Sequence, residues 1–176
     1  MRATELRLKG AFTIEPEKFA DVRGFFARSW SQQEFQQLGL DQNLVECNVS
    51  FNKTKGTLRG MHYQAEPHAQ VKVVRCTRGA IFDVIIDLRP DSATFTQWAG
   101  VELTAQNHLM LYIPTGFAHG FQTLRDDTEV LYQMASYYVP ESGRGVRWND
   151  PAFGIQWPDD ERIIIARDNE YPDFRA

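Results

Sequence analysis

The chain has 176 residues, of which 43% are hydrophobic and 24% charged, as in soluble globular proteins. This length predicts one domain, spanning residues 1–176, with a full core. The formal net charge of −4 and the lack of any basic run argue against a nucleic-acid partner. No apolar run approaches the ~20 residues of a membrane span, so we expect a cytoplasmic protein with no membrane partner.

The cysteine content does not indicate a disulfide framework. Cys47 and Cys76 are the two cysteines, and the sequence shows no signal-peptide pattern. Disulfide-rich domains are typically short and secreted, with several cysteines at characteristic spacings. We therefore expect no structural disulfides.

The first clear elements along the chain are a short helix and a strand. Ser31–Leu38 begins with serine, a preferred residue at helix starts, and continues with glutamate and glutamines, which favour a helix. Arg59–Gln64 has the pattern of a strand, and it places an arginine, a glycine and a histidine close together. These residue types make this strand the first candidate for chemistry.

Strand patterns then dominate the chain. Gln70–Cys76 and Ala80–Leu88 are rich in β-branched residues, partly alternate, and are separated by a turn at Thr77–Gly79. Turn residues recur between the later segments as well. The further predicted strands are Thr94–Leu103, His108–Pro114 and Thr128–Tyr138. Short strands at this spacing predict an all-β sandwich or barrel with few helices.

The C-terminal segment has a different character. From Trp148 onward the periodicity is lost, yet Trp148 and Trp157 are unusual residues for a floppy tail. We expect this segment to fold back over the barrel. Asp159–Arg162 is predicted to form a single further turn of helix.

Two histidines indicate proton-transfer chemistry on an anionic substrate. His62 lies in the predicted strand, and His119 follows in a predicted Pro-x-Gly-x-x-His turn at Pro114–Gly120. Histidine has an ordinary pKa of about 6.5, close to neutral pH. Arg59 could hold a phosphate near them through two parallel hydrogen bonds.

A metal centre is the main alternative for these histidines. The strand and turn resemble the cupin arrangement, in which two histidines point into a jelly-roll mouth and often bind a metal. His62, Glu66, His68 and His119 are the candidate ligands, but Gln64 stands where cupin metal sites usually have a second histidine. Pro67 should hold His68 away from the strand, since residues share a strand face only at even separations without a turn. A metal is therefore disfavoured.

The chain resembles the dTDP-4-dehydrorhamnose 3,5-epimerase family of nucleotide-sugar epimerases over essentially its full length. The resemblance implies a cupin jelly roll. It rests on the order and spacing of several segments rather than on any one of them. These segments are Asp21–Phe26, Lys55–Gln64, Ala69–Arg75, Asp83–Arg89, Ile113–Phe121 and Trp148–Pro151.

The resemblance implies a reaction and a catalytic set. The family inverts carbons beside the ketone of a nucleotide-linked 4-keto-6-deoxy sugar, through an enolate. This chemistry needs a base on one face, an acid on the other, and a positive donor beside the carbonyl oxygen. His62 matches the base, Asp168 the carboxylate that orients it, Tyr132 the acid and Lys72 the cation. No metal or redox cofactor is implied.

The resemblance also implies a binding set and a homodimer. Arg59 and His119 are expected to bind rather than react, and Arg23 and Phe26 to reach the base of the neighbouring subunit's nucleotide. In the family an N-terminal strand joins the partner's sheet, which would also cover an edge strand. The other expected binding residues are Glu46, Asn48, Tyr138 and Arg167.

Two departures from the family pattern fall near the expected nucleotide or sugar. The family's Gln-x-Asn is Glu46-Cys47-Asn48 here, and Arg28 stands where the family typically has glutamate. A glutamate can accept from the ring N–H of thymine, whereas an arginine complements the bare acceptor of cytosine. Arg28 therefore raises the hypothesis of a cytidine or guanosine nucleotide, against the alternative that it is an exposed strand-edge residue.

Several functions remain in competition at this point. The first is the epimerase, acting at one or both carbons. The second is a related nucleotide-sugar ketoisomerase, or a 3- or 5-only epimerase of a CDP- or GDP-sugar. The third is a metal cupin, and the fourth is a sugar-binding jelly roll. A binding module needs no aligned base, acid and cation, so the combination of His62, Tyr132 and Lys72 favours the epimerase.

Overall fold

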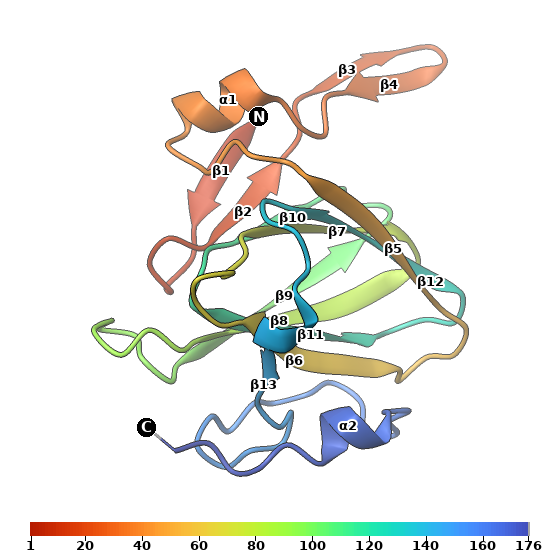
Figure 1. The fold of residues 1–176 in the computed structure, drawn as a ribbon. Coiled ribbons are helices and arrows are strands. Elements are labelled where there is room, and N and C mark those ends of the chain that lie inside the picture. Colours follow the sequence, from red (N-terminus) through yellow and green to blue (C-terminus); the bar gives the residue numbers. More distant parts are fainter. Residues whose placement is uncertain (176) are drawn as a thin grey trace.

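The computed structural model describes residues 1–175, and antiparallel strands form most of its regular structure (Figure 1). One sheet has six strands in the order β1-β2-β10-β7-β12-β5. They are β1 (Arg2–Glu5), β2 (Phe12–Glu15), β10 (Met110–Ile113), β7 (Lys72–Arg78), β12 (Thr128–Met134) and β5 (Glu46–Asn52).

A second sheet has five strands in the order β13-β6-β11-β8-β9, and β3 and β4 form a separate hairpin. The strands of the second sheet are β13 (Gly143–Gly145), β6 (Leu58–Gln64), β11 (Phe117–Thr123), β8 (Ala80–Asp87) and β9 (Trp98–Thr104). The remaining elements are β3 (Lys18–Asp21), β4 (Gly24–Ala27), α1 (Gln32–Gln37), a 3-10 turn (Pro140–Ser142) and α2 (Ala166–Asn169).

The two large sheets pack face to face and enclose the main core. Apolar side chains of β7, β10 and β12 meet those of β8, β9 and β11 there. Val74, Leu111, Val130, Ile85 and Phe121 are among the buried members of this core. The architecture is therefore an antiparallel, cupin-like β-sandwich, and the predicted all-β jelly roll is confirmed.

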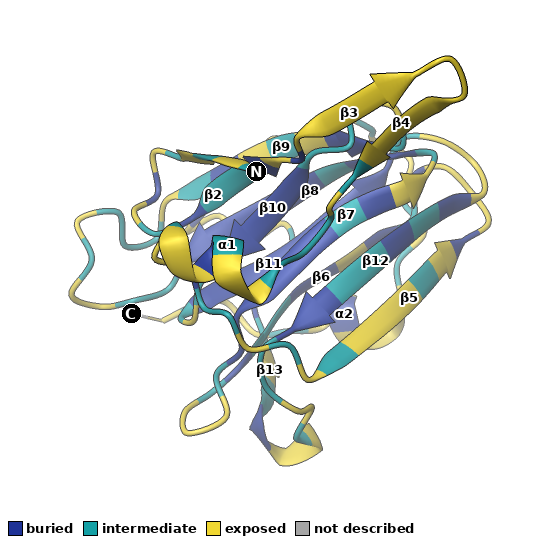
Figure 2. Cartoon of the chain, turned by 90° about the horizontal axis from the view of Figure 1, so that it is seen from above, coloured by how far each residue is buried: buried dark blue, intermediate teal, exposed yellow. Residues whose placement is uncertain are grey.

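The outer faces of both sheets are covered as well. Phe35 of α1 packs with Val73 and Met110 on the outer face of the six-stranded sheet. Met61 and Ile86, on the outer face of the other sheet, pack against Val146 and Phe153 of the segment that follows β12. Covering both faces explains why every residue of β11 is buried (Figure 2). It also explains why β8 reads as a nearly continuous apolar run.

The C-terminal segment runs beneath the five-stranded sheet, as expected from its tryptophans (Figure 1). Ile163 forms a parallel bridge with Thr57, and its backbone exchanges hydrogen bonds with Gly56 and Leu58, at 3.0 and 2.9 Å. This attachment brings α2 against β6. A segment far along the chain thus reaches the strand that carries His62.

Three sequence expectations need correction. Asp159–Arg162 is not helical, because the Asp159 backbone bonds to the side-chain amide of Gln122 at 3.0 and 3.1 Å instead of continuing a helical ladder. The predicted turn at Pro114–Gly120 is limited to residues 115 and 116, and His119 lies within β11. The predicted strand Thr94–Leu103 starts only at Trp98, because Thr94 turns to donate a hydrogen bond to Asp87.

The other expected elements are present with shifted ends. The helix predicted at Ser31–Leu38 is α1, and the Ser31 hydroxyl accepts from the Glu34 N–H as its N-cap. The strand predicted to extend to Tyr138 is β12 and ends at Met134. Among residues 1–175, no helix is long and apolar enough to cross a membrane.

Candidate active site

A cavity of about 710 Å³ opens between the sheets and is closed on one side by the C-terminal segment. Strands β5, β6, β7, β11 and β12 contribute to its wall, together with α2. All four expected catalytic residues line it, namely His62, Lys72, Tyr132 and Asp168. Four of the expected binding residues line it as well, namely Asn48, Arg59, His119 and Arg167.

His62 and Asp168 form a hydrogen-bonded pair. The His62 Nε2 atom lies 2.8 Å from Asp168 Oδ1, and only 1% of the Asp168 side chain is exposed, against 31% for His62. A carboxylate can only accept, so Nε2 carries the hydrogen and Nδ1 keeps its lone pair. The pair therefore fixes the imidazole tautomer that can take a proton through Nδ1.

Asp168 remains ionised despite its burial. Burial opposes the charge, but hydrogen bonds from His62, the Gly60 N–H and Arg167 outweigh it, and the pKa of Asp168 lies below its ordinary value. The Gly60 N–H donates to Asp168 Oδ2 at 3.1 Å. Each oxygen of the carboxylate therefore has a donor. This arrangement keeps a negative charge beside the imidazole.

The contact from Gly60 depends on a close approach between β6 and β11. Gly60 has a φ of +137°, and a Cβ placed there would lie 2.5 Å from the Cα of Gly120. The pairing of these strands shifts between His119 and Phe121, directly beside this contact. Only glycine fits such a conformation and spacing, so the Arg59-Gly60-Met61-His62 segment builds the site through its backbone.

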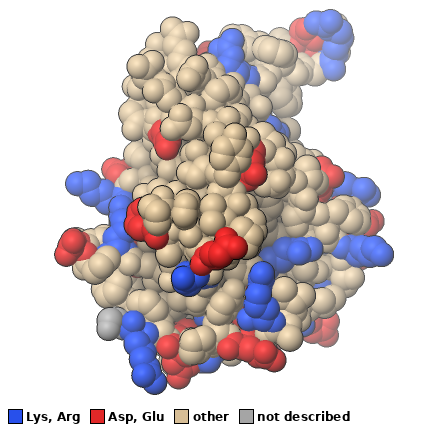
Figure 3. Space-filling model, viewed as in Figure 1, with Lys and Arg blue, Asp and Glu red and all other residues tan. Residues whose placement is uncertain are grey.

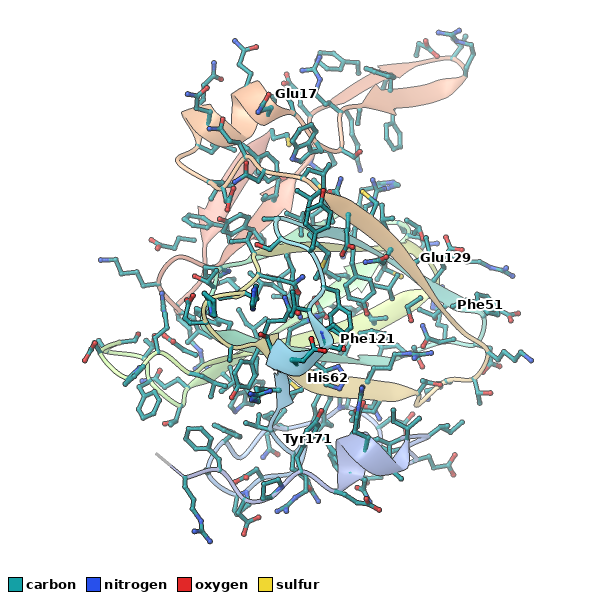
Figure 4. All side chains as sticks on the ribbon, in the orientation of Figure 1. Glu17, Phe51, His62, Phe121, Glu129 and Tyr171 are labelled. Carbon is teal, nitrogen blue, oxygen red and sulfur yellow. The ribbon has the colours of Figure 1, made fainter. Side chains whose placement is uncertain are left out.

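Arg167 is also in contact with the His62–Asp168 pair. Its Nε donates to Asp168 Oδ1 at 3.1 Å, and its Nη2 lies 3.3 Å from His62 Nε2. The side chain of Arg167 is 61% exposed, so one face of the guanidinium is open to the cavity. Tyr171 lies just after α2, and its ring stands edge-on to the imidazole of His62, with ring centroids 6.3 Å apart (Figure 4).

Lys72 supplies a buried ammonium group. It lies on β7, is 9% exposed, and donates to the His62 carbonyl oxygen at 3.3 Å. Burial lowers the pKa of Lys72 to about 8, while the charge of Asp83 opposes this change. At neutral pH the group is therefore mostly charged, with few partners inside the protein. Such an ammonium is suited to meet negative charge on a substrate oxygen.

Tyr132 is the buried phenol of the cavity. Burial, reinforced by the negative charge of Asp83, raises the pKa of Tyr132 well above its ordinary value. Its ring packs edge-on to His119 with centroids 6.0 Å apart. The phenol therefore stays protonated at neutral pH and can act as a proton donor.

His119 is locked in a second histidine–carboxylate pair. Its Nε2 lies 2.7 Å from Asp83 Oδ1, and both side chains are buried. Burial lowers the pKa of His119, and Asp83 opposes this effect. His119 also faces His62 directly across the β6–β11 pair. The pairing fixes the orientation of His119, as expected of a group that binds rather than exchanges protons.

The other expected binding residues lie outside the cavity wall. Arg23, Phe26 and Arg28 belong to the β3–β4 hairpin and the loop after it, which projects from the body of the molecule (Figure 1). Arg28 forms an ion pair with Glu34 at 2.5 Å. Glu46 accepts from the Tyr138 N–H at 3.3 Å at the start of β5. The structure does not bring these five residues to the cavity within one chain.

The candidate metal ligands are not gathered in one place. Nδ1 of His68 lies 2.8 Å from the Ser142 hydroxyl, in a turn after the cis peptide bond between Glu66 and Pro67. His62 and His119 each pair with a different carboxylate. Within residues 1–175, no group of three or more His, Cys, Asp or Glu side chains is arranged to hold a metal ion.

Three residues of the site were missed by sequence reasoning. Asp83 is predicted as part of a strand and of a segment that carries the resemblance but is given no role in the site, although an aspartate in the middle of an apolar run is a signal in itself. Ser50 and Asn52 line the cavity from β5. Polar residues at every second position from Glu46 to Asn52 would have indicated a polar strand face.

Comparison with known proteins places these features in a family. The sequence profile described as dTDP-4-dehydrorhamnose 3,5-epimerase matches residues 5–176. The chain belongs to this family. A dTDP-4-dehydrorhamnose 3,5-epimerase of Sinorhizobium fredii is 44% identical over 160 residues, covering 90% of this chain and 82% of the relative.

Solved structures agree with this assignment. A dTDP-4-dehydrorhamnose 3,5-epimerase from Bacillus anthracis with TDP and PPi bound has a TM-score of 0.95 and 42% identity, covering 98% of this chain and 99% of that one. The dTDP-6-deoxy-D-glucose-3,5-epimerase of Legionella pneumophila, in complex with dTDP-4-keto-L-rhamnose, has a TM-score of 0.89 and 36% identity, covering 95% and 89%. These names do not favour a ketoisomerase, or an epimerase for CDP- or GDP-sugars.

Proposed function

We propose that this protein inverts carbons 3 and 5 of a thymidine-diphosphate-linked 4-keto-6-deoxy sugar, as dTDP-4-dehydrorhamnose 3,5-epimerases do. The observation that carries the proposal is the meeting of an oriented base, a protonated phenol and a buried ammonium in one cavity. The protein is thus an isomerase that works by proton transfer. A non-catalytic sugar-binding jelly roll would not need this combination.

At each carbon the reaction needs removal of a proton from one face and addition of a proton from the opposite face. Nδ1 of His62 takes the proton beside the ketone, and the electron pair of the broken C–H bond moves to form an enolate. The ammonium of Lys72 stabilises the negative oxygen at carbon 4. Tyr132 then gives its proton to the same carbon from the opposite face, which inverts it. Proton exchange with solvent restores both groups.

Binding of the nucleotide diphosphate is assigned to the cationic side of the cavity. Arg59 and Arg167 both line it and can hold phosphate oxygens, while His119 faces the sugar. Basic and acidic side chains are interspersed over the visible surface (Figure 3). Attraction of an anion therefore depends on this local group, because the net charge of the chain is −4.

We further propose that two copies of the chain form a homodimer and complete each other's nucleotide sites. The hairpin that carries Arg23 and Phe26 is exposed along its length (Figure 2). Several of its large apolar residues face solvent, including Val22, which is fully exposed, and Phe26, of which 70% of the surface is accessible. Val49 and Phe51 are exposed on the edge strand β5. Exposed apolar patches and open strand edges are typical of interaction surfaces.

Product analysis by NMR tests the proposed reaction. The protein is incubated with 4-keto-6-deoxy-glucose linked to thymidine, cytidine or guanosine diphosphate. We expect conversion of the thymidine substrate to the 4-keto-rhamnose product, with both carbons inverted. Inversion of a single carbon would restrict the activity to a monoepimerase, and preference for cytidine or guanosine would revive the role considered for Arg28. Binding without conversion would contradict the proposal.

A further inference from the structure

Strand β5 has a polar face, and most of this face lines the cavity. Glu46, Asn48, Ser50 and Asn52 alternate with Cys47, Val49 and Phe51 along this edge strand. Asn48, Ser50 and Asn52 all line the cavity. Asn52 is 2% exposed although it ends an edge strand. A buried amide needs hydrogen-bond partners on both its oxygen and its nitrogen.

Asn52 has such partners, and they fix its orientation. Its Nδ2 donates to the carbonyl oxygens of Ser50 and Thr128 at 3.3 and 3.2 Å. Carbonyl oxygens only accept, so the amide cannot be turned the other way. Its Oδ1 therefore faces Arg59 and accepts from Arg59 Nε at 2.7 Å.

This bond orients the arginine at the entrance of the cavity. Nε is occupied by Asn52, and Nη2 makes one long contact of 3.5 Å with the Phe51 carbonyl oxygen. The two terminal nitrogens of the guanidinium keep most of their donors for an anion. A guanidinium that is held by Nε loses less rotamer freedom when it binds two phosphate oxygens.

The same strand face leads on to the phenol. Asn52 Nδ2 lies 3.5 Å from the Ser50 hydroxyl, at the limit of a hydrogen bond. Strands β5 and β12 pair with Ser50 opposite Val130 and Asn48 opposite Tyr132, so the side chains of Ser50 and Tyr132 lie diagonally across this pair and both line the cavity. Ser50 lowers the pKa of Tyr132, against the larger effect of burial. Arg59, Asn52, Ser50 and Tyr132 thus follow one another along the cavity wall between the anion-binding end and the proton donor.

We propose that Asn52 is the positioning residue for Arg59, and that Ser50 has the same role for Tyr132. The inference rests on the proposed function, in which Arg59 holds the diphosphate and Tyr132 donates the proton. Asn52 preorganises the guanidinium for phosphate oxygens, and Ser50 keeps the phenol directed at the sugar. The polar face of β5 thereby sets the distance between the two ends of the substrate.

A double-mutant cycle on binding tests the role of Asn52. The variants are Asn52→Ala, Arg59→Met and the double variant, and the probe is thymidine diphosphate, measured by calorimetry. Because Asn52 acts only through Arg59, we expect Asn52→Ala to weaken binding by about tenfold. The double variant should bind like Arg59→Met alone. Additive losses, or unchanged binding by Asn52→Ala, would refute the proposal.

A matched control separates positioning from folding. Asn107 accepts hydrogen bonds from Thr104 and Leu109 in the turn after β9, away from the cavity. Asn107→Ala should lower the melting temperature without changing the Kd for thymidine diphosphate. If Asn52→Ala lowers the melting temperature equally and leaves the Kd unchanged, Asn52 is purely structural. Unchanged binding by Arg59→Met would instead contradict the proposed binding site.

Ser50→Ala tests the proposed role of Ser50 in positioning Tyr132. Loss of the hydroxyl should lower kcat by about fivefold to tenfold with little change in KM, since the phenol loses one orienting partner. Ser50→Thr keeps the hydroxyl and should recover most of kcat. An increase in KM alone, or no recovery with threonine, would show that Ser50 does not position Tyr132.

Discussion

Burial changes the pKa values of Lys72 and Tyr132 in opposite directions, and both changes suit the proposed reaction. Water no longer solvates a charge on either group, so the lysine loses its proton more easily and the tyrosine holds its proton more firmly. The charge of Asp83 opposes the effect on Lys72 and reinforces it on Tyr132. Of these two groups, the ammonium of Lys72 is therefore the one that titrates nearer to neutral pH.

The first prediction is an alkaline fall in activity due to Lys72. The charged form stabilises the enolate, it predominates below a pKa of about 8, and it is lost above this value. We expect kcat to fall as pH rises through about 8, in steady-state assays across pH 6–10. In Lys72→Arg the charge persists, so the alkaline fall should move to higher pH. An unchanged fall in this variant would assign it to another group.

The second prediction separates the acid from the base. Tyr132→Phe removes the donor on one face and leaves the His62–Asp168 pair intact. Inversion should slow by about 10²–10⁴-fold, while His62 still removes protons and returns solvent protons from the same face. NMR in deuterated water should therefore show exchange without inversion. If Tyr132→Phe lost deuterium exchange as well as inversion, Tyr132 would also take part in proton removal.

At the scale of elements, the contact between β6 and β11 holds the His62–Asp168 pair in place. A Cβ at Gly120 would lie 2.6 Å from Met61 Sδ and 2.9 Å from the Gly60 Cα. Any added atom there must separate the two strands. The separation would weaken the hydrogen bond from the Gly60 N–H to Asp168. Because Asp168 orients His62, adding one methyl group at Gly120 should also disturb the imidazole.

The third prediction follows from this contact. Gly120→Ala should lower the free energy of unfolding by about 1–3 kcal/mol through overpacking, and lower kcat by more than tenfold as Asp168 shifts. Gly143→Ala on β13 is the control, because its Cβ would meet nothing closer than 3.2 Å. Denaturant unfolding and kcat measurements provide the test. Equal kcat in both variants would show that the strand contact does not support the site.

The elements also show what the sequence could reveal. Strand β8 is buried on both faces and reads as a long apolar run, so the sequence pattern predicts it. Strand β11 is equally buried but contains His119, Gly120 and Gln122, and the pattern does not predict it as a strand. Short strands of four residues, such as β1 and β2, have too few alternations to stand out. The position of α2 against β6 depends on the bridge between Ile163 and Thr57, and local sequence patterns cannot predict a contact between residues so far apart in the chain.

For the site, the family resemblance named residues to which it assigns a role, and residues whose role depends on a contact with another strand were missed. His62 and Lys72 lie within strands that the resemblance covers, and both line the cavity. Asn52 and Asp83 have roles that depend on partners 7 and 36 positions away, Arg59 and His119. Those pairings arise from strand order and not from local sequence.

At the scale of the whole molecule, the groups proposed to bind the nucleotide lie apart within one chain. Arg59 lies in the cavity, whereas Arg23 and Phe26 project on the exposed β3–β4 hairpin (Figure 2). A second copy of the chain could bring its hairpin to this cavity. The proposed homodimer therefore predicts that activity requires two subunits.

The fourth prediction is complementation between two inactive variants. Arg23→Ala/Phe26→Ala keeps the catalytic groups and lacks the nucleotide contacts, and His62→Asn has the opposite defect. If hairpins act across the interface, mixing the two should restore activity in the assay, because one site of each heterodimer is complete. Light scattering after size-exclusion chromatography should give a dimer mass. A monomer, or a mixture with no gain in activity, would rule out shared sites.

The most direct test of the account is solvent deuterium incorporation, because it reports removal of the protons beside the ketone. The wild-type protein and His62→Asn are incubated with the thymidine-diphosphate 4-keto-6-deoxy sugar in deuterated water and followed by NMR. We predict deuterium at carbons 3 and 5 with the wild type, and none with His62→Asn, which should still bind thymidine diphosphate. Undiminished deuterium incorporation by His62→Asn would contradict the account.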